Sequence, residues 1–281
     1  DGEAPDEATR EADLLAWFVS PAVDLFQAEH GGYNARGVNH RRLILFVHDA
    51  YWLIYDELAL RGRHHLEWLL YSPHGFTLEN GRMQPDRAPG LMAIPILPEG
   101  ARRIAPVEGV MDVPGPRAYE GASERRLVKG MSHIQETDAP RAAYMHLLYP
   151  AATANELAQV EAIPIKVRGA QAAGCRIRTL DGEDLIVLGA DRAPGEREAE
   201  GWSSDAWAWL TRATGSWALY QGSRLSAGGR TVFQASSAVQ AAVGLRVPDG
   251  LSGEITTTRK TDVRLVLDRP VRQISLNDVV V

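Results

Sequence analysis

The sequence has a single cysteine among 281 residues, so no disulfide bond can form within the chain. Cys175 stands in "AAGCRIRTL", where its neighbours offer no nucleophile–base arrangement. We therefore interpret it as a small buried apolar residue. A fold held together by disulfides is excluded, and a cysteine nucleophile is disfavoured.

The chain also lacks an excess of positive charge and any long apolar run. Lysine and arginine number 30 against 36 acidic residues, which leaves a net charge of −6 and argues against a nucleic-acid partner. No stretch approaches the roughly 20 apolar residues that span a bilayer, so we expect no membrane partner. An anionic ligand would have to be held by local arginines.

The residue pattern along the chain is typical of a β protein. Apolar residues make up 45% and charged residues 23%, which is ordinary for a globular chain of this length. Short apolar runs alternate with turn signals such as Asp181–Gly182 and Gly228–Gly229, and little of the sequence has a helical pattern. These features predict an all-β fold, an antiparallel β-sandwich of many strands.

The expected domain organisation is simple. Residues 1–20 form an acidic lead-in, in which "ADLLAWF" could close a short helix before Pro21. Residues 21–281 are expected to form the β-sandwich domain. A weak internal boundary is expected near residues 191–202, where charge and glycine cluster. The segment "ATANELAQVEA" is compatible with a short helix or a loop.

Two apolar runs, "RRLILFV" and "YWLIYDEL", flank a turn at residues 48–50 and predict a hairpin that pairs residue 40 with a position near 58. Because side chains alternate between faces, His40 and Arg42 should share one face. Asp56 should then lie close to His40, about one diagonal away. A third strand, "LEWLLYS", is expected in the same sheet and would bring in further polar residues, namely His64, His65, Tyr71 and His74.

The convergence of His40 and Asp56 has two interpretations. Imidazole and carboxylate are suitable zinc ligands, and a third protein ligand would complete a site that leaves one position for water. The other interpretation is a His–Asp hydrogen bond that stiffens the sheet, and the residues alone favour it.

The segment "HGGY", residues 30–33, differs in kind. Its two glycines allow a close backbone approach or a positive φ. His30 and Tyr33 flank this tight turn, and both can transfer protons. The alternative is a turn in which the two side chains only cap and pack.

Residues 23–73 resemble the C-terminal β-domain of heparinase II/III-like polysaccharide lyases. In that family a segment like "HdGY" precedes a hairpin of the form "H-x-R…yWlivDel…H…wllH". Here "HGGY", "NHRRLILFV", "YWLIYDEL" and "HHLEWLLYSP" match it in order and spacing.

The resemblance implies a secreted or periplasmic enzyme that cleaves an acidic, uronic-acid polysaccharide or oligosaccharide by β-elimination without an organic cofactor. In such enzymes a base removes the proton α to the uronate carboxylate, a polar cluster neutralises that carboxylate, and an acid protonates the leaving oxygen. By this resemblance His30 and Tyr33 would be catalytic, and Arg42 and Asn39 would bind the substrate.

The resemblance further implies a structural zinc ion, with His40 and Asp56 among its ligands. The third ligand of the family usually falls in "WLLH", but position 71 is Tyr here, so His74 could take the role if the strand bulges. The family also carries a catalytic histidine where this chain has Val38.

Members of the family also have an N-terminal α-helical toroid that contributes to the active site. We expect this toroid to be missing from this chain, and the chain to be inactive alone. The alternatives are a non-catalytic carbohydrate-binding or structural module, and a glycoside hydrolase, for which no carboxylate pair stands out.

Overall fold

The structure is a computed structural model that describes residues 12–20, 22–72, 75–98, 103–114, 123–190, 195–246, 250–266, 275–276 and 279–280. Most of the described chain is strand and very little is helix, which confirms the all-β prediction. No helix in these ranges is long and apolar enough to cross a membrane.

The chain divides into two compact units. The first comprises residues 1–164 and 175–183, and the second comprises residues 165–174 and 184–281. The weak boundary expected near residues 191–202 therefore lies inside the second unit, so the charge and glycine there do not mark a division between units.

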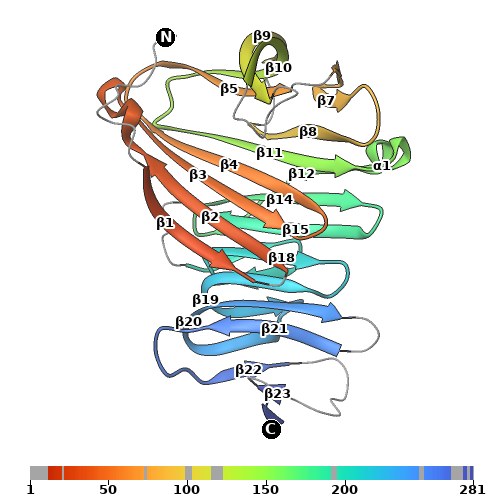
Figure 1. The fold of residues 1–281 in the computed structure, drawn as a ribbon. Helices are drawn as coiled ribbons and strands as arrows, with labels where there is room; N and C mark the ends of the chain where they lie inside the picture. Colours follow the sequence, from red (N-terminus) through yellow and green to blue (C-terminus); the bar gives the residue numbers. More distant parts are fainter. Residues whose placement is uncertain are drawn as a thin grey trace. The chain divides into compact units, whose positions relative to one another are not determined.

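An eight-stranded antiparallel sheet forms the larger layer of the first unit (Figure 1). Its strands, in spatial order, are β1 (Ala12–Val19), β2 (Val23–His30), β3 (Val38–Val47), β4 (Tyr51–Leu60), β11 (Arg141–Ala151), β8 (Gly90–Leu97), β7 (Arg82–Pro85) and β6 (Phe76–Glu79).

Strand β1 corrects one expectation, because the segment expected to end in a helix is an edge strand paired with β2. Ala16 and Phe18 are buried, whereas Trp17 and Val19 are exposed. This period of two is that of a strand with one buried face, and it overrides the local helical propensity of "ADLLAWF".

The β3–β4 hairpin has the predicted register. His40 lies opposite Leu58, and Arg42 lies directly opposite Asp56. The turn is completed by Asp49, whose φ of 58° is a left-handed conformation that aspartate tolerates.

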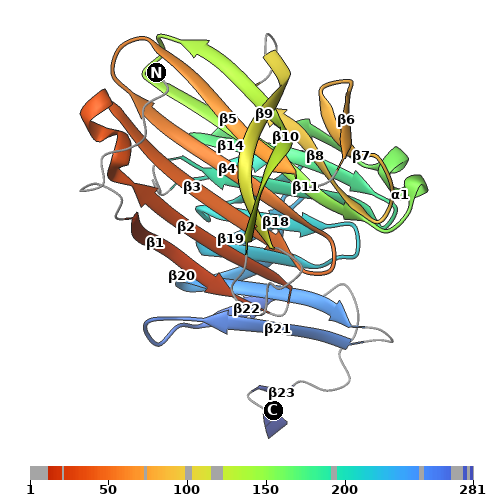
Figure 2. The ribbon, with the colours of Figure 1, turned by 45° about the horizontal axis from the view of Figure 1, so that its top comes forward.

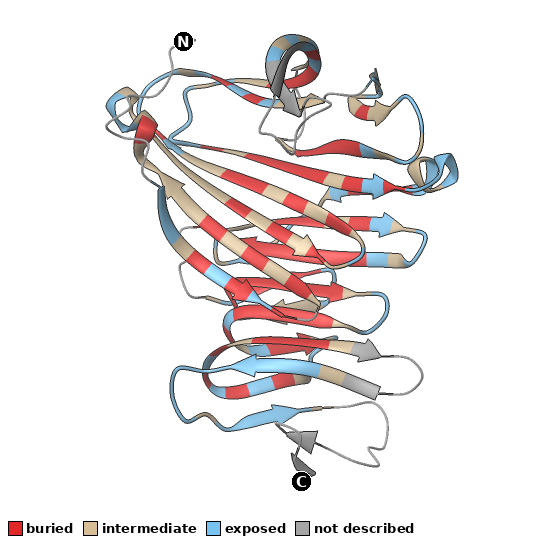
Figure 3. Ribbon diagram, viewed as in Figure 1, coloured by how far each residue is buried: buried red, intermediate tan, exposed pale blue. Residues whose placement is uncertain are grey.

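Alternation gives the large sheet two distinct faces. One face of β3 and β4 is apolar and buried around the hairpin turn; its members there are Leu43, Leu45, Val47, Tyr51, Leu53 and Tyr55. The opposite face carries His40, Arg42 and Asp56. Figure 3 shows this as buried positions alternating with half-buried ones along β2, β3 and β4.

A second layer lies over the face that carries His40 (Figures 1 and 2). It is a three-stranded antiparallel sheet in the order β5 (His64–Ser72), β10 (Ser123–Thr137) and β9 (Arg103–Pro114). The third strand was expected in the sheet of β3 and β4, and that prediction was wrong: β11, not β5, is the other neighbour of β4.

The reason is burial. Leu66 and Trp68 of β5 pack in one apolar cluster with Val38, Leu60 and Tyr144 of the large sheet. Burial of each large apolar side chain contributes about 1.5–3 kcal/mol, which favours folding the strand over the sheet rather than adding it at the edge.

The first unit ends with the short helix α1 (Ala154–Gln159), which settles the segment left open by the sequence. Thr153 caps it by accepting a hydrogen bond from the Glu156 amide, and the Glu156 side chain accepts a hydrogen bond from the Ala152 amide. Strand β12 (Glu161–Pro164) then pairs with the part of β14 (Ala172–Thr179) that contains the fully buried Cys175.

The second unit is a further antiparallel sheet. Its strands are β15 (Gly182–Gly189), β18 (Ala208–Arg212), β19 (Trp217–Ala227), β17 (Trp202–Ser204), β16 (Arg197–Ala199) and β13 (Arg168–Gly169), with β20 (Arg230–Arg246) pairing β19, β21 (Gly250–Thr256) and β22 (Val263–Leu265). The turn between β19 and β20 falls at Gly228–Gly229, both with positive φ, as the sequence predicted. Strands β23 (Ser275–Leu276) and β24 (Val279–Val280) form a separate pair.

Candidate functional site

The hairpin brings His40, Arg42 and Asp56 together on one face. His40 precedes Arg42 by two residues and so points the same way, and Arg42 lies opposite Asp56. The Nε2 atom of His40 is 2.7 Å from Oδ1 of Asp56. The predicted proximity of this imidazole and this carboxylate is confirmed.

Asp56 accepts four hydrogen bonds. Arg42 donates from Nε to Oδ1 at 2.7 Å and from Nη2 to Oδ2 at 3.0 Å, and Trp68 donates from Nε1 to Oδ2 at 3.0 Å. His40 supplies the fourth bond. A carboxylate has about four lone-pair positions, so every acceptor position of Asp56 is used.

The electrostatics of Asp56 follow from these bonds. Burial raises the pKa of the Asp56 carboxyl, but the hydrogen bonds from His40 and Arg42 and the charge of Arg42 outweigh burial and hold that pKa below its ordinary value. Asp56 is therefore an anion, and His40 must carry its proton on Nε2 in order to donate. Side-chain exposure rises from 2% at Asp56 to 22% at His40 and 43% at Arg42, so the network reaches from the interior to the surface.

His30 ends β2 and lies directly opposite His40, on the same face. A 3-10 helix, residues Gly31–Arg36, follows it, and the Gly32 amide donates to Nδ1 of His30 at 3.1 Å. Tyr33 stands in this helix with its ring centroid 5.7 Å from that of His30. Both predicted catalytic residues are thus half-buried at the end of the β2–β3 pair.

The cap fixes the tautomer of His30. Because Nδ1 accepts a hydrogen bond, the proton of the neutral ring is on Nε2. Neutral His30 can donate a hydrogen bond from Nε2, but it has no lone pair there with which to act as a base.

Asn39 is not part of this cluster. It lies on the other face of β3, where its Nδ2 donates to Oε1 of Glu29 at 2.8 Å. Arg41 holds the second oxygen of Glu29 at 2.6 Å, and the hydrogen bonds from Arg41 and Asn39 lower the pKa of Glu29. The structure therefore brings Arg42, but not Asn39, to the predicted site.

The expected metal ligands are placed in part. His40 Nε2 and Asp56 Oδ1 are adjacent and are donor types that zinc accepts. His74 lies outside the described residues. No cluster of three or more potential ligand side chains occurs within the described part of the chain. The two placed donors fit a zinc ion, and His74 as the third protein ligand stays a prediction.

Tyr71 does not take the place of a ligand. A Cβ added at Gly109 or Gly130 would lie 2.6–2.7 Å from its ring, so the ring covers these two glycines of β9 and β10. Its neighbour Leu70 packs into the apolar cluster, and successive strand residues face opposite ways. Tyr71 therefore points away from the side of β5 that faces Asp56.

Sequence reasoning missed the buried aromatic support of the site. Tyr144 of β11 lies directly opposite Asp56 and donates from its hydroxyl to the Leu66 carbonyl at 3.0 Å. Burial, with the charges of Glu67 and Asp56, raises the pKa of Tyr144 well above its ordinary value. Tyr144 is therefore a neutral hydrogen-bond donor.

Two buried histidines complete this support. His146 stacks on Trp68 with ring centroids 3.6 Å apart, and its Nε2 lies 3.0 Å from Nδ1 of His133. The only available signal was the alternation in "AAYMHLLYP", which places Tyr144 and His146 on one face but does not say which face or which strand they meet.

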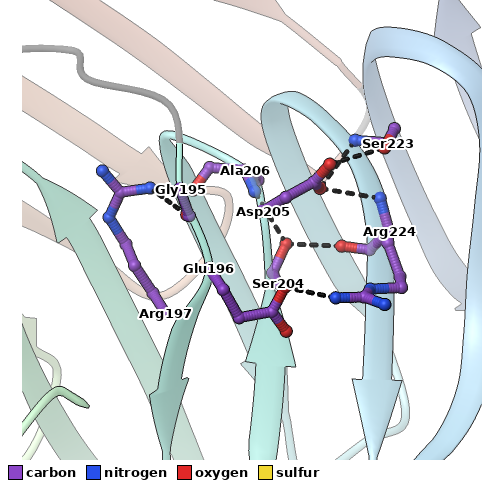
Figure 4. Close-up of polar contacts among 8 residues, drawn as sticks. All are labelled: Gly195, Glu196, Arg197, Ser204, Asp205, Ala206, Ser223 and Arg224. Atoms are coloured by element: carbon purple, nitrogen blue, oxygen red, sulfur yellow. Dashed lines mark hydrogen bonds and ion pairs between the residues drawn. The ribbon is translucent and has the colours of Figure 1, made fainter. Parts of the chain in front are cut away.

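The second unit contains another polar cluster, around Asp205 (Figure 4). Asp205 accepts hydrogen bonds from the amides of Ser223 and Arg224, both at 2.8 Å, and from the Ser223 hydroxyl. These contacts hold an irregular part of β19, where the register with β20 shifts and Gln221 has a φ of 54°.

Arg197, in the same cluster, is fully buried. Its Nη1 donates to the carbonyls of Gly195 and Ala206 at 2.9 and 3.1 Å (Figure 4). Burial lowers the pKa of Arg197, opposed by the charge of Asp205. Neither contact involves another side chain, so we interpret the cluster as structural: it ties the segment before β16 to the one after β17.

A comparison with protein families and a comparison with solved structures both identify proteins that are similar to this chain. Residues 4–87 match the family model described as "Heparinase II/III-like, C-terminal", which confirms the resemblance seen in the sequence over that segment. No curated protein matches the sequence.

Solved structures with similar folds include a heparinase III, with 14% identity and a TM-score of 0.50, and the heparan sulfate lyase HepC from Pedobacter heparinus, with 12% identity and a TM-score of 0.48. Each match covers 64% of this chain but only 27–28% of the solved chain. This chain thus corresponds to little more than a quarter of those proteins, and the likeness to heparinase III supports the β-sandwich fold.

Proposed function

We propose that this chain, which carries a heparinase II/III-like C-terminal domain, is the β-domain of a polysaccharide lyase that cleaves uronic-acid glycans by β-elimination. The observation that carries the proposal is the alignment of His30 and His40 on one face, with Tyr33 beside the first and Arg42 beside the second. It supports the proposal because a phenol, an imidazole and a guanidinium then lie at the same end of the sheet.

In the proposed reaction a base removes the proton α to the uronate carboxylate. The electrons of that C–H bond form a C=C bond, and the glycosidic C–O bond breaks. The leaving oxygen takes a proton, for which Tyr33 is the candidate donor, and His30 would donate a hydrogen bond from Nε2 at the same place. Arg42, whose Nε and Nη2 hold Asp56, would present Nη1 to the substrate carboxylate.

The base is proposed to come from an N-terminal α-helical toroid that is not part of this chain. Neutral His30 has its proton on Nε2, and Val38, where the family has its histidine, is buried in the apolar cluster. The chain alone should therefore be inactive. A secreted or periplasmic location and an acidic polysaccharide as substrate belong to the same proposal.

A structural zinc ion held by His40, Asp56 and His74 is a further part of the proposal. The ion would take the place of the hydrogen bond between His40 and Asp56, so that both atoms bind metal instead of sharing a proton. Its contribution would be to fix the hairpin against the segment that follows β5.

Zinc analysis of the purified chain tests this part. We expect about one zinc ion per chain and its loss in Asp56→Asn. A wild-type chain that is purified with zinc present and still contains none would contradict the metal proposal.

The lyase proposal is tested in a protein that includes the toroid, by the ultraviolet absorbance of the unsaturated uronate formed from heparan sulfate or other uronic-acid polymers. We expect Tyr33→Phe and His30→Asn each to lower kcat/KM by about 10²-fold or more. Asparagine can accept the Gly32 amide bond, so His30→Asn removes the imidazole but keeps the cap.

Asn34→Ala, an exposed position in the same 3-10 helix, is the matched control and should retain activity. Full activity in both His30→Asn and Tyr33→Phe would remove these residues from the mechanism.

A non-catalytic carbohydrate-binding or structural module is the alternative. The burial of Val38 favours it, since the position used for catalysis in the family is part of the core here. A toroid-containing protein that binds glycans and forms no unsaturated product would select this alternative.

A further inference from the structure

Four aromatic side chains lie on the same face of the large sheet as His40 and Arg42. Trp17 of β1 is opposite Phe26 of β2, and Phe26 is opposite Ile44 of β3. Phe46, two residues beyond Ile44, is opposite Trp52 of β4. Directly opposed residues share a face, so Trp17, Phe26, Phe46 and Trp52 form one aromatic strip across four strands.

The rings of the strip are paired and reach the surface. Trp17 and Phe26 meet edge to face at 5.8 Å, and Phe46 stacks on Trp52 at 4.9 Å with an interplanar angle of 11°. Trp17 is 58% exposed, and the other three are half-buried. Exposed apolar side chains that are contiguous rather than scattered mark a contact surface.

An open groove extends the strip toward the centre of the sheet. Its volume is about 920 Å³. Trp52 belongs to both features, and the floor of the groove is apolar, formed mainly by Ile44, Ile54, Leu91, Leu148 and Pro150. The strip and the groove together form a continuous apolar path across one face.

Polar pairs flank the strip on both sides along the direction of β3. Arg42, two residues before Ile44, is 43% exposed and uses only Nε and Nη2 for Asp56. On the other side, His48 Nε2 lies 3.1 Å from Asp24 Oδ2, and its ring is 4.9 Å from that of Phe46. The core of a protein–protein interface is depleted of charge, whereas ligand sites combine apolar walls with a few placed polar groups.

We propose that the aromatic strip binds the sugar rings of an acidic oligosaccharide, an inference that rests on the function proposed above. Pyranose rings have apolar C–H faces that stack on aromatic side chains, and Nη1 of Arg42 binds a carboxylate or sulfate group of one residue. The surface thus positions the chain of sugars beside the His30 and Tyr33 end of the sheet. Trp17 lies on the outermost strand, opposite Phe26, and makes the stacking contact at that edge of the sheet.

Isothermal titration calorimetry of this chain tests the inference without requiring catalysis. The probes are hexasaccharides of heparan sulfate and of alginate, with maltohexaose as the neutral control. We expect saturable binding of an acidic hexasaccharide that weakens as salt is raised, and little binding of maltohexaose.

Trp17→Ala should weaken binding by about fivefold or more, and Trp17→Tyr, which keeps a ring, should stay within about twofold of wild type. Leu127→Ala is the matched control, since Leu127 is a 70% exposed apolar residue on β10, and it should not change the affinity.

Absence of binding to both acidic hexasaccharides, equal binding of maltohexaose, or an unchanged affinity in Trp17→Ala would overturn the inference. Binding and lyase activity are measured separately, so the two proposals can fail separately. If the toroid-containing protein is active and its Trp17→Ala variant binds and cleaves as wild type does, the strip proposal fails and the lyase proposal stands. If Trp17→Ala weakens binding but the toroid-containing protein has no lyase activity, the lyase proposal fails and the strip proposal stands.

Discussion

Asp56 is the residue through which the candidate site is joined to the core. It is almost fully buried, and its four hydrogen bonds come from the neighbouring strand β3 of the large sheet and from β5 of the covering sheet. The sequence predicted the contact with His40 from hairpin geometry alone. It could not predict the bond from Trp68, because that bond depends on β5 folding over the sheet.

Asp56→Asn should therefore destabilise the protein. The amide keeps the shape but leaves Arg42 without its counter-ion in a partly buried position, and we expect the free energy of unfolding to fall by about 2–4 kcal/mol. Urea denaturation measures this. Asp138→Asn, at an exposed position, is the control and should change stability by less than about 0.5 kcal/mol. Equal stability of the two variants would contradict the role assigned to Asp56.

The same residue predicts a pH dependence. Since the folded-state pKa of Asp56 lies below its unfolded value, its contribution is fully present above the unfolded pKa and is lost as pH falls through the folded pKa. The stability difference between wild type and Asp56→Asn should therefore be constant near neutral pH and shrink below about pH 4. A difference that grows as the pH is lowered through this range would contradict this sign.

At the scale of elements, the sequence predicted hairpins well and sheet membership poorly. The β3–β4 and β19–β20 hairpins follow from turn residues between apolar runs. The strand at 12–19 and the placement of β5 do not, because pairing partners far apart in the chain are chosen by burial rather than by local pattern. The sequence did not predict three residues of the site, because their contacts depend on this long-range pairing. They are Trp68, Tyr144 and His146.

The β5–β10 pair contains a pH-sensitive contact. His65 lies opposite Glu136 and contacts both Glu136 and Glu67, whose hydrogen bonds raise the pKa of His65. Because the pKa of His65 is raised in the folded state, its contribution to the free energy of unfolding is fully present below the pKa of the unfolded state. This contribution is lost as the pH rises through the pKa of the folded state.

The NMR titration of His65 should therefore have its midpoint above about 6.5, and Glu136→Gln should lower it. An unchanged midpoint in Glu136→Gln would show that the contact does not form in solution.

The irregular part of β19 depends on glycine. A Cβ at Gly222 would lie 2.3 Å from Cβ of Ala206, with backbone atoms of the same residue at 2.6 and 2.9 Å. Gly222→Ala should lower the free energy of unfolding by about 1–3 kcal/mol, since the backbone must move to make room.

Gly244→Ala is the control for this substitution, because the nearest atoms would be 3.9 Å away and its φ is not left-handed. Gly244→Ala should lower the free energy of unfolding by less than about 1 kcal/mol, as measured by thermal or urea denaturation. If Gly222→Ala proves no more destabilising than this control, the close approach of Ala206 is not rigid.

At the scale of the whole molecule, composition and turn spacing were sufficient for the all-β fold, because frequent short apolar runs admit few other architectures. The division into two units was not predictable. Its boundaries follow Pro164, Gly174 and Glu183, where the local sequence shows no linker, and the last two lie inside β14 and β15.

The central claim is the proposal that this chain is the β-domain of a polysaccharide lyase. The most direct measurement is the ultraviolet absorbance of unsaturated uronate in two samples, this chain alone and the same chain joined to the N-terminal toroid proposed for it, each incubated with uronic-acid polymers. We predict product only from the joined protein, with loss of that product in Tyr33→Phe. No product from a folded toroid-containing protein on any uronic-acid polymer would contradict the account.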